Sequence, residues 1–351
     1  MKRRFLAATL AALTLAAVST GCGNSGSTGN AGAASGAGNS AGSAASGTPT
    51  YTWKMHLNST EGDNAYDMGA LFAEKVSELT DGQVKVDLYG GASLGSTAEV
   101  LEGMSVGVAD IAVESVGTLA TFTPLANIEA MPYMFNSYDH FMEVWYSDLG
   151  DEIKTTVGDA AGFKLLGAAY RGPRIVTATK EMKTIEDFKG FKLRAPNLEM
   201  YIKTWQWLDA APTPLAMNEV YTALQQKTVE GQENPMVDSL NYAFDEVCDY
   251  WIKTNHVYGC NVVIMDKGYF EGLPADIQDA VAQAADYAGK AISEAQAEKD
   301  AAAEEELKSM GKTVIEVDNA AFAEYFKDFA ATNYPDFADW VARIAEMDPA
   351  K

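Results

Sequence analysis

The sequence predicts an α/β protein built from two lobes, and three observations carry this prediction. The chain has 351 residues, which is long enough to form two hydrophobic cores. Short runs of alternating apolar and polar residues, typical of strands, are interleaved with longer runs whose apolar residues have helical spacing. The same alternation restarts near residue 163. Two α/β lobes with several crossings between them are the simplest architecture that fits this pattern.

The first set of elements predicts the order strand, helix, strand, helix, strand. Strands are expected at 51–57, 83–89 and 110–115, and helices at 63–82 and 96–106. The first helix places these apolar residues on one face: Ala65, Met68, Phe72, Val76 and Leu79. This order implies a parallel or mixed sheet with helices on its faces.

The second set repeats the pattern and ends in helices. The expected strands are 163–170, 191–197, 229–235 and 261–265, and the expected helices are 184–190, 199–210 and 218–228. Residues 273–310 predict one long helix, rich in alanine and acidic residues. The last forty residues are predicted to be helical, with these aromatic anchors: Phe322, Tyr325, Phe326, Phe329 and Trp340.

The amino terminus has the features of a targeting signal. Three basic residues precede an apolar run, 5–18, that is too short to span a bilayer comfortably. The sequence STGC that follows resembles the lipobox of bacterial lipoproteins, with Cys22 as the lipidated residue. An ordinary secretory signal is the alternative. Either signal takes the mature protein out of the cytoplasm.

We therefore assign 1–21 as a lipoprotein signal peptide and 22–48 as a low-complexity tether. Residues 23–48 contain only Gly, Ala, Ser, Asn and Thr, so they cannot bury enough surface to offset the cost of ordering. The expected location is extracytoplasmic, either lipid-anchored to the cell membrane or periplasmic. The remaining cysteines, Cys248 and Cys260, could pair there, or they could be two buried thiols.

The charge balance excludes several classes of function. The formal net charge of −23 repels nucleic acids and anionic lipid head groups, so neither is expected as a partner. An anionic ligand would need a local cluster of cations. The sequence contains no H-x-x-x-H, C-x-x-C or calcium-loop motif and no phosphate-binding P-loop, so neither a metal nor a cofactor is predicted.

A G-x-S-x-G pattern at 91–95 raises the possibility of catalysis. Ser93 stands where serine hydrolases carry their nucleophile, and His256 follows in a suitable order to act as the base. The alternative is a glycine-rich turn between a strand and a helix. Five-residue patterns of small residues often arise by chance, so no enzyme activity is predicted, and a secreted hydrolase remains a minor alternative.

The stretch 189–235 contains the chemistry that best predicts a function. Arg194 lies at the carboxyl end of a predicted strand, just before a proline, and Asn234 has a similar position. Ligands of open α/β sheets bind beyond the carboxyl ends of strands. The planar guanidinium of arginine suits a carboxylate, although an ion pair with a nearby Asp or Glu is the alternative.

This stretch resembles the signature region of the substrate-binding proteins of TRAP (tripartite ATP-independent periplasmic) transporters. The segments LRAPN, APTPLA, EVYTALQ and VEGQENP occur in the order and at the spacing typical of that family. Three upstream features also resemble that family: the segment YRGPR, the segment VES, and a glycine-rich turn followed by LG. The resemblance covers essentially all of 51–345.

The resemblance implies a two-lobed periplasmic-binding-protein fold with mixed sheets, a long interlobe helix and a ligand cleft. The first lobe would contain 51–171 and 260–299, and the second 172–259 and 300–351. The implied function is capture of a small organic acid, either a C4-dicarboxylate or a sugar acid such as a hexuronate. The protein would deliver it to the membrane subunits of a TRAP permease. A receptor for an ABC-type importer is the alternative within this class.

The family's motifs also imply the residues of the cleft. Arg194 matches the carboxylate-binding arginine, and Arg174 matches the second cleft arginine. Asn234 matches the cleft asparagine of QENP, and Asn197 follows the arginine in RAPN. Met217 lies where the family often packs an apolar or aromatic residue on the bound carboxylate.

Three further residues bear on the ligand. Glu114 matches a cleft acid used for polar substrate groups, and Asn58 matches a cleft residue of sialic-acid binders. Both could receive the hydroxyl groups of a sugar acid. Arg171 is an additional cation that could hold a second carboxylate, which would favour a dicarboxylate, or it could face solvent.

The sequence departs from the sialic-acid type in two places. That type has a further arginine where this chain has Gly117, and an acidic residue where this chain has Ser96 and Thr97. Both departures argue against a sialic-acid ligand.

Overall fold

The computed structural model describes residues 50–350. The predicted signal peptide, the tether and Cys22 lie outside the described residues. Within them, no helix is long and apolar enough to cross a membrane.

The first section of the sheet contains the strands predicted at the start of the chain. Its order is β2–β1–β3–β9–β4. β1 is parallel to both β2 and β3, whereas β9 is antiparallel to β3 and to the first half of β4. The strands are β1 (Tyr51–Leu57), β2 (Val84–Tyr89), β3 (Ile111–Ser115), β9 (Tyr258–Asp266) and β4 (Phe163–Ala178).

The second section shares β4 with the first. The second half of β4 pairs antiparallel with β7 and β8; β7 and β6 flank β5 in parallel, and β10 pairs with β8. The strands are β5 (Lys192–Ala195), β6 (Ala211–Pro214), β7 (Gly231–Pro235), β8 (Tyr250–Lys253) and β10 (Thr313–Glu316). The ten strands found in 50–350 thus form one mixed, hydrogen-bonded array.

Strand β4 is longer than predicted, and its irregularity positions two arginines. The prediction ended this strand at residue 170, before the Gly-Pro pair of YRGPR. The chain instead continues through Gly172, with φ +88°, and the register against β9 shifts between Tyr170 and Pro173. Glycine tolerates this backbone conformation. The strand therefore crosses from one section of the sheet to the other with Arg171 and Arg174 at the crossing.

The amino-terminal helices have the caps that their sequences indicate. Asp63 caps α1 by accepting a hydrogen bond from the backbone N–H of Ala65, and Ser96 and Glu99 form a reciprocal capping box on α2. The first seven helices are α1 (Asn64–Leu79), α2 (Thr97–Gly103), α3 (Tyr138–Trp145), α4 (Asp148–Ala161), α5 (Glu199–Trp207), α6 (Met217–Gln225) and α7 (Met236–Asn241). The others are α8 (Lys267–Glu271), α9 (Ala275–Ser309), α10 (Asn319–Phe326), α11 (Phe329–Asn333) and α12 (Ala338–Glu346).

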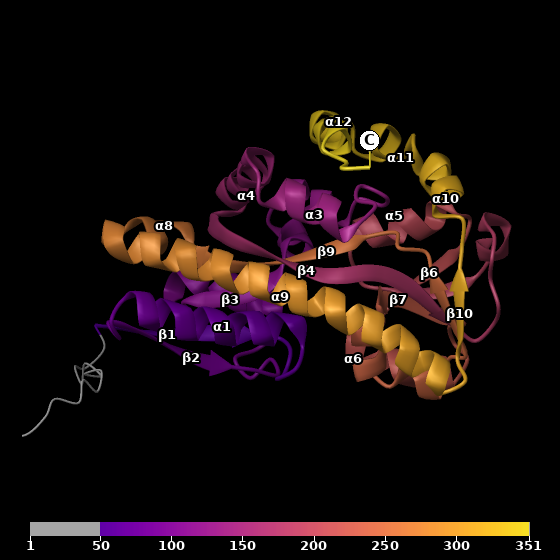
Figure 1. Ribbon diagram of the computed structural model, residues 1–351, viewed down its shortest axis with the longest axis horizontal. Coiled ribbons are helices and arrows are strands. Elements are labelled where there is room, and N and C mark those ends of the chain that lie inside the picture. The colour runs from indigo at the N-terminus through magenta and orange to yellow at the C-terminus, as the bar shows by residue number, and fades with distance from the viewer. Residues whose placement is uncertain (1–49, 351) are drawn as a thin grey trace, which may run out of the picture. The chain divides into compact units, whose positions relative to one another are not determined.

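Helix α9 runs beside both sections of the sheet, from α1 and β1 at one end to β10 at the other (Figure 1). Small residues let it approach β4 closely. A Cβ on Gly289 would lie 2.5 Å from the carbonyl oxygen of Ala168, so only glycine fits there. The long helix predicted over 273–310 is therefore confirmed.

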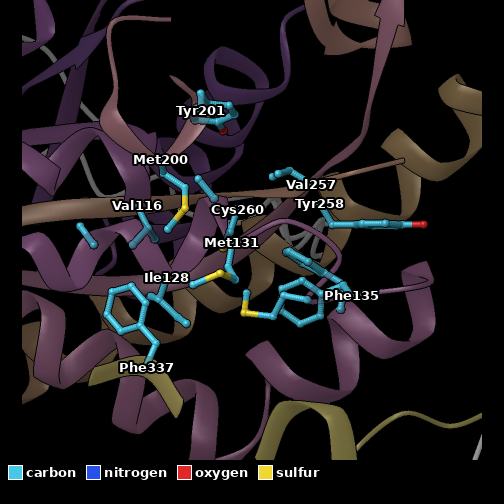
Figure 2. Close-up of a cluster of buried hydrophobic side chains, with 14 of the residues drawn as sticks. Val116, Ile128, Met131, Phe135, Met200, Tyr201, Val257, Tyr258, Cys260 and Phe337 are labelled. Atoms are coloured by element: carbon cyan, nitrogen blue, oxygen red, sulfur yellow. The ribbon is translucent and has the colours of Figure 1, made fainter. Parts of the chain in front are cut away.

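Two large hydrophobic cores lie against the sheet. In one core, α1 and α9 pack on the first section of the sheet, and Phe72 and Val281 are among its buried residues. The other joins α3, α4 and α5 to the carboxy-terminal segment. Figure 2 shows part of this second core, to which Met200 from α5, Cys260 from β9 and Phe337 all belong.

The carboxy-terminal segment, residues 319–350, contacts both α5 and α4. Phe329 packs edge-on against Trp207 of α5 with ring centroids 5.4 Å apart. Trp340 of α12 donates a hydrogen bond to Glu152 of α4 over 2.9 Å. The lobe boundaries expected from the resemblance remain predictions.

Cys248 and Cys260 are both buried and unpaired. This corresponds to the second of the two alternatives left open by the sequence. Burial raises the pKa of each thiol.

Candidate functional site

A cavity of about 210 Å³ lies where strands from both sections of the sheet end. Its walls come from the carboxyl ends of β1, β3, β5 and β7, from β4 and β9 and from the first turns of α1, α6 and α7. Seven of the eight predicted site residues line it: Asn58, Glu114, Arg171, Arg174, Arg194, Met217 and Asn234. Asn197 is exposed in the loop after β5 and is not among the lining residues.

Arg194 is a buried cation whose partner is a neutral carbonyl group. Only 4% of the residue is exposed. Its Nε and Nη2 both donate to the carbonyl oxygen of Leu215, at 3.0 and 2.6 Å. Among the described residues it forms no ion pair, and burial lowers its pKa to about 10. The charge of Glu233 opposes this shift without forming a contact. A buried guanidinium with no carboxylate in ion-pair contact is suited to binding an anion from outside the chain.

Arg174, in contrast, is already paired with an acid of the chain. Its Nε and Nη2 donate to the two carboxylate oxygens of Glu233, at 2.5 and 2.9 Å, and Nη2 also donates to the Glu233 carbonyl. The guanidinium lies over the ring of Tyr201, 4.9 Å from its centroid. Burial alone would raise the pKa of Glu233, but the charge of Arg174 holds it at about 2.

His256 belongs to the same buried group. Its Nε2 lies 3.1 Å from a Glu233 oxygen, and its Nδ1 lies 2.9 Å from the Thr254 hydroxyl. Both ring nitrogens therefore have partners away from Ser93, which is exposed in the turn after β2. The arrangement offers no support for a Ser93–His256 catalytic pair.

Arg171 is the third arginine of the cavity, and it also has an internal carboxylate. Its Nη2 lies 3.0 Å from Asp238 Oδ2, on α7. Burial raises the pKa of Asp238, and the charge of Arg171 opposes this shift. Two of the three cavity arginines are thus neutralised within the chain.

Glu114 is the predicted acid of the opposite wall. Its Oε1 accepts a hydrogen bond from the Thr97 hydroxyl over 2.7 Å. His56 lies behind it, with Nε2 3.9 Å away and neither ring nitrogen hydrogen-bonded. Burial raises the pKa of Glu114 to about 7 and lowers that of His56. This carboxyl group can accept hydrogen bonds from ligand hydroxyl groups.

The structure gives a reason for one departure from the sialic-acid type. A Cβ on Gly117 would lie 2.7 Å from a carboxylate oxygen of Glu129, a fully buried acid. Glu129 accepts hydrogen bonds from the Ser115 hydroxyl and from the Cys260 backbone N–H. An arginine at position 117 would therefore require the Glu129 carboxylate to move from these partners.

Asn234 and Met217 form the floor beside Arg194. The side-chain nitrogen of Asn234 donates to Gln232 Oε1 over 2.8 Å and lies 3.8 Å from the Met217 sulfur. Met217 opens α6, so its side chain reaches the cavity from a helix end. This wall combines an amide with a polarisable apolar group.

Sequence reasoning missed several lining residues. Asp63 could have been found because it caps α1, and Ser115 because it follows Glu114 in the quoted VES segment. Asp238, Tyr242 and Asn261 carry no local signal that separates them from other polar residues. The described residues contain no cluster of three or more His, Cys, Asp or Glu side chains that could hold a metal ion.

The fold and the cavity together define an α/β receptor. Three arginines line its pocket, and carboxylates of the chain neutralise two of them. Residues 56–337 match the model of the bacterial extracellular solute-binding proteins, family 7. The chain belongs to this family. The predicted two-lobed α/β fold with a ligand cleft and the predicted resemblance to TRAP solute-binding proteins are thereby confirmed.

Individual relatives agree with this assignment. A solute-binding protein of Roseobacter denitrificans is 34% identical over 275 residues, which cover 77% of this chain and 83% of the relative. The sialic acid-binding periplasmic protein of Vibrio cholerae is 30% identical over 281 residues, covering 80% and 88%.

Solved structures of TRAP periplasmic solute-binding proteins share the fold. The Roseobacter denitrificans structure with bound L-galactonate has a TM-score of 0.77 and 31% identity, covering 85% of this chain and 99% of that one. A Sulfitobacter structure with bound β-D-galacturonate has a TM-score of 0.75 and 26% identity, covering 83% and 98%.

Proposed function

We propose that this protein is the solute receptor of a TRAP transporter and that its ligand is a sugar acid with one carboxylate. The observation that carries this proposal is the contrast among the three arginines. Arg171 and Arg174 have carboxylate partners within the chain, whereas Arg194 has none among the described residues. One uncompensated buried cation matches one ligand carboxylate.

The other lining groups favour hydroxyl groups over a second carboxylate. Glu114 and Asp63 line the cavity and form no ion pair with an arginine among the described residues, so a second ligand carboxylate beside them would be repelled. Hydroxyl groups can donate hydrogen bonds to these acids and to Asn58. The galactonate and galacturonate in the neighbouring structures have this chemistry, one carboxylate and several hydroxyl groups.

A thermal-shift screen followed by calorimetry tests the proposal. A ligand that binds only the folded state raises the melting temperature by mass action. The panel contains D-glucuronate, D-galacturonate and L-galactonate, with succinate and malate as the dicarboxylate arm. We expect one or more sugar acids to raise the melting temperature. A response to dicarboxylates alone would contradict the assignment of the ligand.

Delivery to a membrane permease is the second part of the proposal. Family membership supports this role, and uptake by vesicles that contain the two TRAP membrane subunits tests it. Uptake of the radiolabelled sugar acid should require this protein. Equal uptake without it, or uptake that requires an ATPase subunit, would contradict the role.

Lipid attachment at Cys22 is the third part, and it is supported by the lipobox-like STGC sequence. Cells grown with labelled palmitate should give a labelled membrane-bound protein. The Cys22→Ser variant should be unlabelled. Release of unlabelled wild-type protein would indicate an ordinary secretory signal instead.

A further inference from the structure

A chain of buried side-chain amides connects the ligand cavity to helix α9. Asn261 Nδ2 donates to Asn64 Oδ1 over 2.9 Å, and Asn64 Nδ2 donates to Gln296 Oε1 over 3.1 Å. Gln296 Nε2 then donates to Asp300 Oδ1 over 2.8 Å. Asn261 lines the cavity, whereas Gln296 and Asp300 belong to α9. All three amide residues are at most 4% exposed.

The direction of this chain is fixed by a backbone carbonyl group, which can only accept. The carbonyl oxygen of Tyr170 accepts from Asn64 Nδ2 over 2.9 Å, and the same nitrogen faces Gln296. Gln296 must therefore direct its oxygen to Asn64 and its NH₂ group to Asp300. Asn64 must direct its NH₂ group to Tyr170 and Gln296, which leaves its oxygen for Asn261.

The consequence for Asn261 is a defined amide orientation. Its NH₂ group faces Asn64 Oδ1, because the reverse orientation would bring two oxygen atoms together. No described residue donates a hydrogen bond to Asn261 Oδ1. This oxygen is also not one of the fully buried atoms that lack a partner. The ligand cavity thus has a hydrogen-bond acceptor that is held in place from behind.

We propose that Asn261 accepts a hydrogen bond from one hydroxyl group of the bound ligand, with Asn64 as the positioning residue that sets its amide orientation. This inference rests on the proposed sugar-acid function and assigns a specificity-determining pair within it. Arg194 would recognise the carboxylate that all such acids share, whereas Asn261 would distinguish acids by the position of a hydroxyl group.

The test measures how the loss of a single ligand hydroxyl group changes the affinity of the wild-type protein and of each variant. Dissociation constants are measured by calorimetry for D-glucuronate and for each of its monodeoxy derivatives. With the wild-type protein, removal of the hydroxyl group that contacts Asn261 should weaken binding about tenfold. With Asn261→Ala, the penalty for that one derivative should fall to within about twofold, while the penalties for the other derivatives persist.

The positioning role is tested by Asn64→Leu, which removes the acceptor that faces Asn261. In this variant, the derivative that lacks the hydroxyl group contacting Asn261 should bind within about twofold of D-glucuronate, because the Asn261 amide is then free to turn. Gln296→Leu provides a second variant in case Asn64→Leu fails to fold. It should lower the same penalty less, since the Tyr170 carbonyl still holds Asn64. Gln283→Leu, at an exposed position of α9, is the matched control and should change nothing.

The outcomes separate this inference from the function on which it rests. If the wild-type protein binds none of the sugar acids in the screen, both are overturned. If it binds D-glucuronate but the variants lose affinity for all derivatives in parallel, Asn64 and Asn261 have only a structural role. That result overturns this inference alone.

Discussion

Replacement of Arg194 by methionine should separate ligand binding from folding. The side chain is buried, its ionic partner is missing among the described residues, and its two hydrogen bonds go to one carbonyl oxygen. Binding of a carboxylate by this group creates a desolvated, charge-assisted pair. Loss of such a pair costs about 2–5 kcal/mol, so the dissociation constant should rise from about 30-fold to several thousandfold.

The stability of the ligand-free protein should change little. Burial lowers the pKa of Arg194 to about 10, which corresponds to about 3 kcal/mol of unfavourable free energy for holding the charge. Arg194→Met removes this cost. It also removes the donors to the Leu215 carbonyl, which stabilise by about 1–3 kcal/mol. The two effects offset each other, so the free energy of unfolding should stay within about 1–2 kcal/mol of the wild-type value.

Urea denaturation followed by tryptophan fluorescence measures the stability, and calorimetry with a sugar acid measures the affinity. Lys85→Met is the control, because it removes an exposed cation on β2 that pairs with Asp87. Two results would refute the reasoning. One is unchanged affinity in the Arg194 variant. The other is a loss of stability above about 4 kcal/mol, which would mean that a buried counter-ion had been removed.

Three further outcomes are expected. Arg174→Met should destabilise the ligand-free protein by about 3–5 kcal/mol in urea denaturation, because it leaves Glu233 buried without its cation; unchanged stability would contradict this. Glu114→Gln should be more stable than wild type at pH 8 by about 3 kcal/mol, since burial raises the pKa of Glu114 to about 7. The ionised form is the destabilising one, so stability is lost as pH rises from about 4.5 to 7, and the difference should vanish in denaturation curves at pH 4. Gly172→Ala should destabilise the protein by about 1–3 kcal/mol, because φ is +88° and the new Cβ would lie 2.7 Å from Asp300 Oδ2. A melting temperature equal to that of wild type would show that this position does not require glycine.

The amphipathic elements of the fold could be predicted from sequence because their signals are local. The strand at 51–57 and the long helix α9 are found where periodicity places them. The short strands β6 and β8 were not predicted, and the helical prediction for the last forty residues was wrong at 313–316, where the chain forms β10. These strands depend on pairing with a neighbour, which local periodicity does not reveal. The continuation of β4 past residue 170 was missed because Gly-Pro usually ends a strand.

The candidate site could be predicted only where a motif marks it. Arg194, Arg174 and Asn234 belong to recognisable segments, and the structure places all three on one cavity. The charge partners could not be assigned from sequence. An ion pair within the chain was the alternative considered for Arg194, yet the cavity arginines that have one are Arg174 and Arg171. Which acid meets which arginine depends on strand pairing, and no local pattern encodes it.

The carboxy-terminal segment has a consequence for how the molecule can change shape. Aromatic contacts attach α11 to α5, while Trp340 and Arg343 of α12 are hydrogen-bonded to Glu152 of α4. The expected lobe boundaries place α4 in one lobe and α5 in the other. With those boundaries, a rotation of one lobe relative to the other must either move this segment or break one of its attachments. The segment should therefore limit how far the lobes of the ligand-free protein can separate.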